Sequence, residues 1–339
     1  MKLRYHNKVK KKSKRRKTVS NIINIRNHYH SQHYFCKTLN KQQGMFVKNI
    51  LPQKITDCLS NKVDMINIFN FVYNRKVIAD LCQSRKIKLT YSEVGFFPHY
   101  DSFCFDPLGF CWESSLTKMQ FFTCSQRQCD VATRIIQKYR IEDNSLPEKI
   151  KHPFFLWPAQ TISDQVNAHG LRCKTWTKLI VHFRSCLPSE IQLVIKIHPR
   201  SQWIRHKHLY ALQKRLNNTV VVNQVSLNAL LYNCVGVVGA NSTVLYKGRL
   251  IYDKPTYVYA KSWFTGHDSL FFPISTEQKS AEIQKFKIQK EYEEYVKWFL
   301  YQLIVRQILR SDCKKERMIQ KMSLLSSYNY YKYGEEIFV

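Results

Sequence analysis

Runs of strand-forming residues alternate with helix-forming segments along most of the chain, and this alternation restricts the fold more than any other feature. In the first series, apolar runs at residues 65–73 and 87–93 flank a helical pattern at 75–83, and helical spacing resumes at 129–139. This spacing is typical of a βαβ unit, in which the two strands are parallel. Residues 94–113 are rich in Gly, Pro and aromatic residues, and we expect a loop there.

The alternation restarts beyond a polar, Pro-containing passage at residues 142–153, which we interpret as a linker. Strands are predicted at 154–158, 191–197, 219–222, 235–239 and 256–259, and helices at 174–186, 207–216, 226–232 and directly after Ser242. A long, charged helical pattern covers 281 to about 325. The sequence therefore predicts an α/β protein with two Rossmann-like domains that face a cleft. We expect a flexible arm at 1–40, domains at 41–150 and 151–275, and C-terminal helices at 276–339 that pack back on the body.

The net charge of +30 calls for a polyanionic partner, but the charge is unevenly distributed. The run KVKKKSKRRK at residues 8–17 is almost wholly cationic, and Asp57 is the first acidic residue. We interpret the start of the chain as a solvated basic arm, which could meet nucleic acid, an anionic membrane surface or phosphorylated sugars. Hydrophobic residues make up 44% of the chain, which is enough for a buried core and excludes wholesale disorder.

The cysteines and the hydropathy pattern indicate an intracellular, cytoplasmic protein. The 11 cysteines are scattered, form no CxxC pair and follow no export signal, so reduced structural thiols are expected. No uncharged apolar run reaches the roughly 18 residues that a membrane span needs. Attachment of the basic arm to the inner face of an anionic membrane stays open. Histidines cluster at 28–33 and 206–208, but without other ligands at metal-binding spacing we predict no metal site.

Ligands of doubly wound sheets bind beyond the carboxyl ends of the strands, so the residues that follow each predicted strand are the candidate site residues. The first group contains the carboxylates of Glu93 and Asp101, on a loop that turns at Gly95 and Pro98. A partly buried carboxylate with a raised pKa can act as a general base or a nucleophile. The alternative is that Glu93 caps the loop and that Asp101 is solvated.

The second group is Gln160 and Asp164, just past the strand at 154–158. The amide and the carboxylate can hold hydroxyl groups of a sugar or a ribose, with Asp164 as a further candidate for catalysis. A local turn or a helix cap would use the same residue types.

Two further groups favour phosphate binding. Lys196, His198, Pro199 and Arg200 follow the strand at 191–197 and bring cationic side chains to a turn. Asn241, Ser242 and Thr243 lie between a strand and a helix, where a hydroxyl can cap the helix and free N–H groups can bind phosphate. A plain surface turn and a plain helix cap are the alternatives. The chain contains no GxxxxGK[ST] and no GxGxxG motif.

Five segments in this order resemble the capsule polysaccharide biosynthesis and export family, which includes Kdo-transferring enzymes. They lie between residues 63 and 273 and read NFVYNRKVIADLCQSRKIKLTYSEVGFFP, FDPLGF, FLWPAQTISDQ, LVIKIHPR and NSTVLYKGRLIYDKPTYVYAKSWF. The resemblance implies a GT-B-type architecture and a glycosyltransferase of capsular or surface polysaccharide synthesis. The donor would be a nucleotide sugar such as CMP-Kdo, the acceptor a lipid-linked glycan or an oligosaccharide, and no cofactor is required.

The resemblance also assigns roles to residues. The HP pair at His198 and Pro199 and the hydroxyl pair at Ser242 and Thr243 would grip the nucleotide phosphate. Glu93 would lie on the acceptor side in the domain at 41–150, and Gln160 with Asp164 on the sugar side in the nucleotide-sugar domain at 151–275.

One position departs from the family pattern, which usually has an acidic residue shortly after NSTV. Lys247 stands there, and Asp253-Lys254-Pro255 replaces the family's GKP. Two other classes of function stay open: a polyanion- or nucleic-acid-binding protein on an α/β scaffold, and a non-catalytic capsule-export factor.

Overall fold

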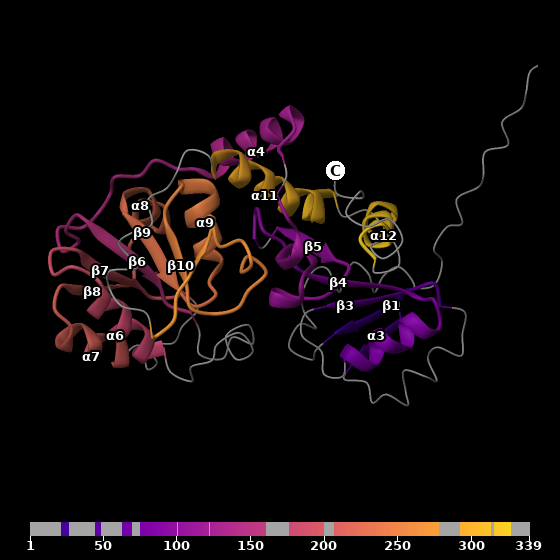
Figure 1. The fold of residues 1–339 in the computed structure, drawn as a ribbon, viewed down its shortest axis with the longest axis horizontal. Helices are drawn as coiled ribbons and strands as arrows, with labels where there is room; N and C mark the ends of the chain where they lie inside the picture. Colours follow the sequence, from indigo (N-terminus) through magenta and orange to yellow (C-terminus); the bar gives the residue numbers. More distant parts are fainter. Residues whose placement is uncertain are drawn as a thin grey trace, which may run out of the picture.

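The two predicted series of strands form two separate sheets, which are the centres of two lobes (Figure 1). The computed structural model describes residues 22–26, 45–48, 63–69, 75–99, 101–121, 123–160, 176–199, 207–277, 292–312 and 315–326. Within these residues the fold is α/β with mainly parallel strands, as the sequence predicts.

The first sheet has the order β12-β5-β4-β3-β1-β2. Its four parallel strands are joined on one side by β5, antiparallel to β4, and by β12, antiparallel to β5. Helix α3 (Arg75–Ser84) connects β3 to β4 and packs its buried Ile78 with Ile66 and Ile68, which confirms the predicted βαβ unit. The strand bounds are β1 (Ile22–Arg26), β2 (Met45–Lys48), β3 (Met65–Phe69), β4 (Lys88–Val94), β5 (Ser102–Asp106) and β12 (Gln307–Leu309).

Three segments of this lobe differ from the prediction. Strand β1 comes from the range 1–40, so residues 22–26 belong to the sheet and not to an arm. Strand β5 lies in the predicted loop at 94–113, where Phe103 and Phe105 are fully buried. Strand β12 interrupts the long helix predicted for 281–325, because its backbone groups pair with β5 instead of continuing the helix.

The second sheet is wholly parallel, with the order β11-β10-β9-β6-β7-β8. Its strands are apolar on both faces, as expected for a parallel sheet that helices cover. The strands are β6 (Phe154–Pro158), β7 (Gln192–Lys196), β8 (Thr219–Val222), β9 (Gly236–Gly239), β10 (Thr256–Val258) and β11 (Phe272–Pro273). The helices of this lobe are α6 (Trp176–Cys186), α7 (Lys207–Arg215), α8 (Leu227–Asn233) and α9 (Thr243–Tyr252).

Helices α4 (Gln126–Tyr139) and α11 (Tyr292–Arg306) lie side by side between the lobes (Figure 1). Both contact α9 of the second lobe, and α11 leads directly into β12 of the first sheet. Buried side chains of α11 such as Phe299, Leu300 and Leu303 join the largest apolar core, and each contributes roughly 1.5–3 kcal/mol by leaving water. The remaining elements are α12 (Lys315–Leu324), which contacts β4, and short 3-10 turns at Cys111–Glu113, Ser115–Lys118 and Arg310–Asp312.

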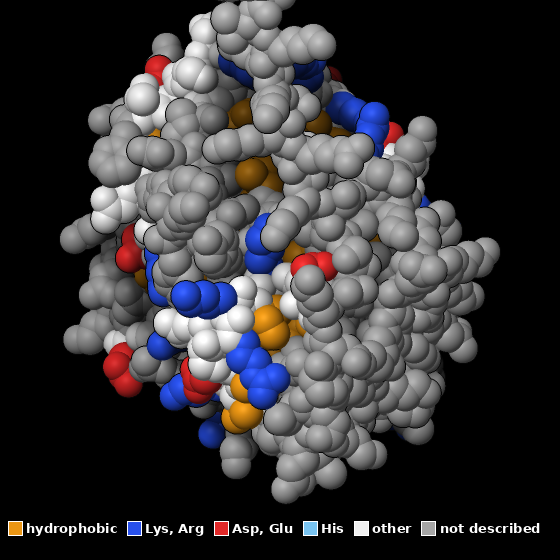
Figure 2. Space-filling model, turned by 90° about the vertical axis from the view of Figure 1, so that its right-hand side faces the viewer, with side chains coloured by type: hydrophobic (Ala, Val, Ile, Leu, Met, Phe, Trp, Pro, Cys, Tyr) orange, Lys and Arg blue, Asp and Glu red, His pale blue; other side chains and the backbone are white. Residues whose placement is uncertain are grey.

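Figure 2 shows the end of the first lobe, where Lys and Arg side chains are interspersed with acidic and hydrophobic ones. The described residues on this face thus carry charges of both signs, as the sequence suggests for the part of the chain beyond its basic start. No helix among the described residues is both long and apolar enough to cross a membrane.

Candidate functional site

The strand order of the second sheet places its topological switch point between β6 and β9. From β6 the chain proceeds to β7 and β8 on one side, and β9, β10 and β11 follow on the other side. A crevice opens at such a point outside the carboxyl ends of the strands, and it is the usual ligand site of doubly wound sheets. Gln160 follows β6 here, and Asn241 follows β9.

Gln160 and Asn241 join the two loops at the switch point by two hydrogen bonds. Gln160 Nε2 donates to the Asn241 carbonyl at 2.7 Å, and the Asn241 backbone N–H donates to Gln160 Oε1 at 3.0 Å. The side-chain amide of Gln160, which the sequence predicts to bind a sugar, thus uses one N–H group and one lone pair within the protein. One N–H group and one lone pair are left for a ligand. Its first role in this geometry is to fix the loop that carries Asn241.

The Asn241 side chain extends this network to the first lobe. Its Oδ1 accepts from Ser262 Oγ at 2.7 Å, and its Nδ2 lies 3.2 Å from the sulfur of Cys111 and 3.4 Å from the Lys261 carbonyl. Cys111 belongs to the first lobe and has a positive φ of 52°, and burial raises the pKa of its thiol to about 12. Asn241 is therefore a buried link between the lobes.

Ser242 and Thr243 form the start of α9, as predicted. The Ser242 hydroxyl accepts from the Val244 N–H at 3.2 Å and caps the helix, while Thr243 is exposed at the first helical position. The remaining N–H groups of the first turn and the helix dipole favour an anion at this end.

Lys196 ends β7 at the same edge of the sheet. Its Nζ donates to the carbonyls of Asn223 and Ile197, and partial burial lowers the pKa of the ammonium group. His198 is half-buried and Pro199 is exposed in the residues that follow. Arg200 and Asp164, the remaining predicted residues of these loops, lie outside the described residues.

The two carboxylates of the first group are in different places. Glu93, the penultimate residue of β4, lines a cavity of about 30 Å³ with Asp106, Cys111 and Arg306, close to the link between the lobes. Asp101 is exposed, lies 3.8 Å from Arg310 in an ion pair, and lines neither this cavity nor the larger pocket described below. The structure therefore brings Glu93, but not Asp101, to the junction of the lobes.

Asp106, the last residue of β5, holds the turn that carries Cys111. Its carboxylate accepts from the backbone N–H groups of Leu108, Gly109 and Ser115, and from the hydroxyls of Ser114 and Ser115. All these partners are local, so Asp106 positions the chain next to Glu93.

Lys247, which replaces the family's usual acid, turns towards α8. Its Nζ donates to Asn228 Oδ1 at 3.0 Å and lies 5.8 Å from the centre of the Tyr252 ring. Burial lowers the pKa of this ammonium group. The substitution is therefore accommodated by contacts between α8 and α9.

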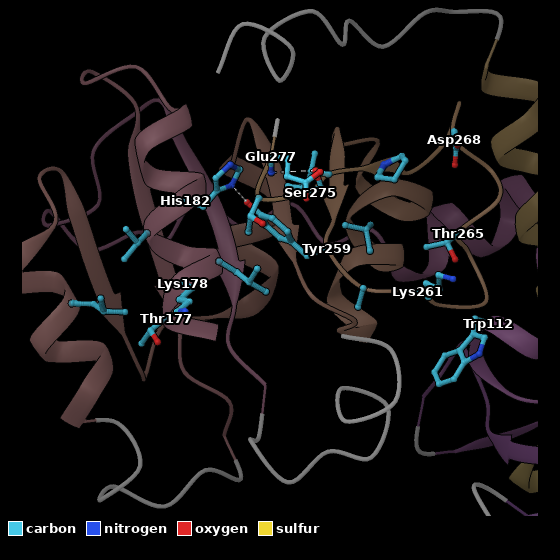
Figure 3. Close-up of a pocket in the computed structure, with 18 of the residues that line it drawn as sticks. Trp112, Thr177, Lys178, His182, Tyr259, Lys261, Thr265, Asp268, Ser275 and Glu277 are labelled. Atoms are coloured by element: carbon cyan, nitrogen blue, oxygen red, sulfur yellow. Dashed lines mark hydrogen bonds between the residues drawn. The ribbon is translucent and has the colours of Figure 1, made fainter. Parts of the chain in front are cut away.

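A large pocket of about 1380 Å³ lies beside α6 and extends to the first lobe (Figure 3). His182 Nδ1 and the Tyr259 hydroxyl form a hydrogen bond of 2.7 Å in it, and burial raises the pKa of the Tyr259 phenol. Charged and hydroxyl side chains converge on this space from separate segments, including Lys178, His182, Tyr259, Lys261, Asp268, Ser275 and Glu277, with Trp112 from the first lobe.

None of the predicted site residues that the structure describes lines this pocket. It is built from one face of α6, part of α7 and the ends of β10 and β11, so no local motif marks it. Tyr259 and Lys261 lie in the segment YVYAKSWF of the family resemblance, which was the nearest signal in the sequence. Among the described residues, no group of three or more His, Cys, Asp or Glu side chains could hold a metal ion.

The solved structures that resemble this fold include two Kdo transferases. The beta Kdo 2,7 transferase of Thermosulfurimonas dismutans KpsC aligns with 89% of this chain and 99% of its own, with a TM-score of 0.57 and 16% identity. The beta Kdo 2,4 transferase of the same protein aligns with 81% of this chain and 89% of its own, with a TM-score of 0.52 and 12% identity. These likenesses support the GT-B-like architecture.

Among curated proteins, none matches this sequence. The family described as capsule polysaccharide biosynthesis protein matches residues 38–309, which is well over half of the 339 residues. The order of the strand-end segments and the architecture both agree with this match. The chain belongs to the capsule polysaccharide biosynthesis protein family.

Proposed function

We propose that the protein transfers a glycosyl group from a nucleotide-activated sugar during capsular polysaccharide synthesis. The observation that carries the proposal is the edge of the second sheet, where the capped start of α9, Lys196 and the loop of Gln160 lie around the switch point. An N–H-rich helix start beside an ammonium group is suited to a nucleotide phosphate.

In this proposal the acceptor hydroxyl attacks the anomeric carbon of the donor, and the nucleotide phosphate departs. Lys196, His198 and the first turn of α9 stabilise the charge that develops on the leaving phosphate, which favours the transition state over the ground state. Glu93, from the other lobe, is the candidate base that removes the proton from the acceptor. The pocket of about 1380 Å³ has ample room for a glycan chain.

CMP-Kdo is the donor that we propose to test first, because the two structural relatives bear the name of Kdo transferases. The acceptor would be a lipid-linked glycan or an oligosaccharide. The basic start of the chain could hold the enzyme at an anionic membrane where such acceptors are made.

The first experiment is a thermal-shift series with nucleotides and nucleotide sugars at fixed salt. A rise in the melting temperature with cytidine nucleotides, lost in His198→Ala and kept in His152→Ala, would support the donor site. His152 is a suitable control because it is an exposed histidine at the entrance to β6, away from the strand ends. An equal shift with every polyanion, unchanged in His198→Ala and removed by salt, would instead favour the polyanion-binding function that the charge of +30 suggests.

A measurement of turnover distinguishes the proposed enzyme from a non-catalytic export factor. With CMP-Kdo and a glycan acceptor, we expect the rate of transfer to fall at least tenfold in Glu93→Gln and in His198→Ala, while nucleotide binding survives in Glu93→Gln. Unchanged rates in both variants would exclude the proposed mechanism. Specific nucleotide binding without any turnover would favour the export factor.

A further inference from the structure

Two cysteines at the start of α4 lie in direct contact. The sulfur atoms of Cys124 and Cys129 are 2.8 Å apart, and Cys129 Sγ is also 4.0 Å from the Cys124 carbonyl. Seven cysteines are described, and all are free thiols. The contact between these two makes them the pair to consider for thiol chemistry.

The helix cap brings the two sulfurs together. Ser125 caps α4 in a reciprocal arrangement: its hydroxyl accepts from the Gln128 N–H at 3.4 Å, and Gln128 Oε1 accepts from the Ser125 N–H at 2.9 Å. Cys124 precedes the cap, and Cys129 is four positions into the helix. Side chains at these two positions pack against each other where a capping box fixes the entry of the chain. The capping box therefore favours the contact between the two sulfurs.

Both thiols are half-buried, so a small reagent can reach them. Two charged residues of α11 face them: the carboxylate of Glu294 raises the pKa of Cys124, and the ammonium group of Lys297 lowers it. Burial, and then the neighbouring Cys129, raise the pKa of Cys124 to about 12. The reactive thiolate is therefore scarce at neutral pH, and its fraction should grow about tenfold for each unit that the pH rises.

We propose that Cys124 and Cys129 form a dithiol site that closes to a disulfide by exchange with a low-molecular-mass disulfide. The thiolate of one cysteine attacks the reagent, the S–S bond of the reagent breaks, and one molecule of its thiol leaves. The second cysteine then attacks the mixed disulfide and expels the second thiol molecule. Two protein thiols are oxidised and one external disulfide is reduced. The sulfurs need to approach from 2.8 Å to about 2.0 Å.

The bond would tie the segment that enters α4 to the first turn of the helix. Helix α4, whose start the bond would brace, packs against α11 and α9 between the lobes (Figure 1). Reduction would restore the two thiols, so the modification is reversible.

The test uses the native full chain and oxidised glutathione at mildly alkaline pH, followed by alkylation of the remaining thiols and digestion with trypsin without a reductant. Trypsin cuts after Lys118, Arg127 and Arg134, so Cys124 and Cys129 fall in different peptides, residues 119–127 and 128–134. We expect these two peptides to be recovered as one linked species, lighter than their sum by two hydrogen atoms. We also expect the linked species to form faster as the pH rises.

Three variants test whether the bond forms between these two cysteines. Cys124→Ser and Cys129→Ser should each abolish the linked species, whereas Cys82→Ala, which removes a buried thiol of α3, should leave it unchanged. If a variant fails to fold, the peptide analysis of the wild type still tests the proposal. Recovery of the two peptides separately alkylated after prolonged oxidation, or linked to other cysteines instead, would overturn the proposal.

Discussion

At the scale of single residues, the candidate site depends on side chains that hold loops rather than on side chains that face open space. Gln160 and Asn241 use their amide groups to connect β6, β9 and the first lobe, and Asp106 uses its carboxylate to hold one turn. Such groups position a site because each leaves a buried partner unsatisfied when it is removed. The direct contacts to a phosphate would then come from the backbone of α9 and from Lys196.

Replacement of Gln160 by Met tests this role. The variant keeps the length of the side chain but removes both hydrogen bonds to the Asn241 backbone, so we expect the free energy of unfolding to fall by about 1–3 kcal/mol. Chemical denaturation measures this free energy of unfolding. The matched control is Gln126→Met, where an exposed amide donates to Asp130 and a change within about 0.5 kcal/mol is expected. Equal losses of the free energy of unfolding in the two variants would show that Gln160 does not position the loop of Asn241.

The sequence indicated which loops carry the site but not how their side chains are used. Glu93, Lys196, Asn241 and Ser242 all lie at strand ends, as the strand pattern predicted. That Gln160 would bond to the backbone of residue 241 depends on two strands becoming neighbours, which no local pattern encodes. The same holds for the pocket of His182 and Tyr259, whose lining comes from separate segments.

At the scale of elements, prediction succeeded where local pattern and tertiary contact agree. Strands β6 and β8 have the predicted bounds, because short apolar runs between helices are typical of buried parallel strands. Strand β12 was missed because it continues directly from a helix and becomes a strand by pairing with β5, across about 200 residues of sequence. Strand β5 was missed because the glycine, proline and aromatic residues around it are typical of a loop, whereas its backbone pairs with β4 on one side and with β12 on the other.

The cap of α4 offers a test at this scale. Ser125→Ala removes the hydroxyl that accepts from the Gln128 N–H, and we expect a loss of about 1 kcal/mol in the free energy of unfolding. Ser84→Ala is the control, because that exposed hydroxyl at the end of α3 donates only to the Leu81 carbonyl within its own helix. Thermal unfolding of the two variants measures the difference. A loss no larger in Ser125→Ala than in Ser84→Ala would mean that packing on α11 alone sets the start of α4.

At the scale of the whole molecule, the two lobes meet through contacts that include a buried histidine. His267 of the second lobe is 1% exposed, and its Nε2 donates to the Leu116 carbonyl of the first lobe at 2.6 Å. Its Nδ1 lies 2.6 Å from the Tyr295 hydroxyl of α11 and accepts from it in the neutral ring. Gly266 precedes it with a φ of 99°, where a Cβ atom would come within 2.7 Å of the Thr117 carbonyl. The imidazole therefore connects both lobes and the helix between them.

Burial lowers the pKa of His267 below the ordinary value of 6.5. As the pH falls through 6.5, the unfolded chain binds a proton at this site while the folded chain does not, so the free energy of unfolding decreases. The contribution of the neutral ring is complete above 6.5 and is lost as the pH falls towards the lower pKa of the folded state. For one group the slope cannot exceed about 1.4 kcal/mol per pH unit.

The measurement is the free energy of unfolding of wild type and His267→Gln between about pH 7.5 and pH 5.5. Glutamine keeps a donor and an acceptor but does not titrate, so every other ionisable group contributes equally to both proteins. We expect the wild type to lose stability relative to the variant as the pH falls through this range. If the difference in the free energy of unfolding between the two proteins does not change with pH, the imidazole titrates alike in the folded and the unfolded chain. A difference that grows in favour of the wild type would mean that protonation strengthens the contact between the lobes.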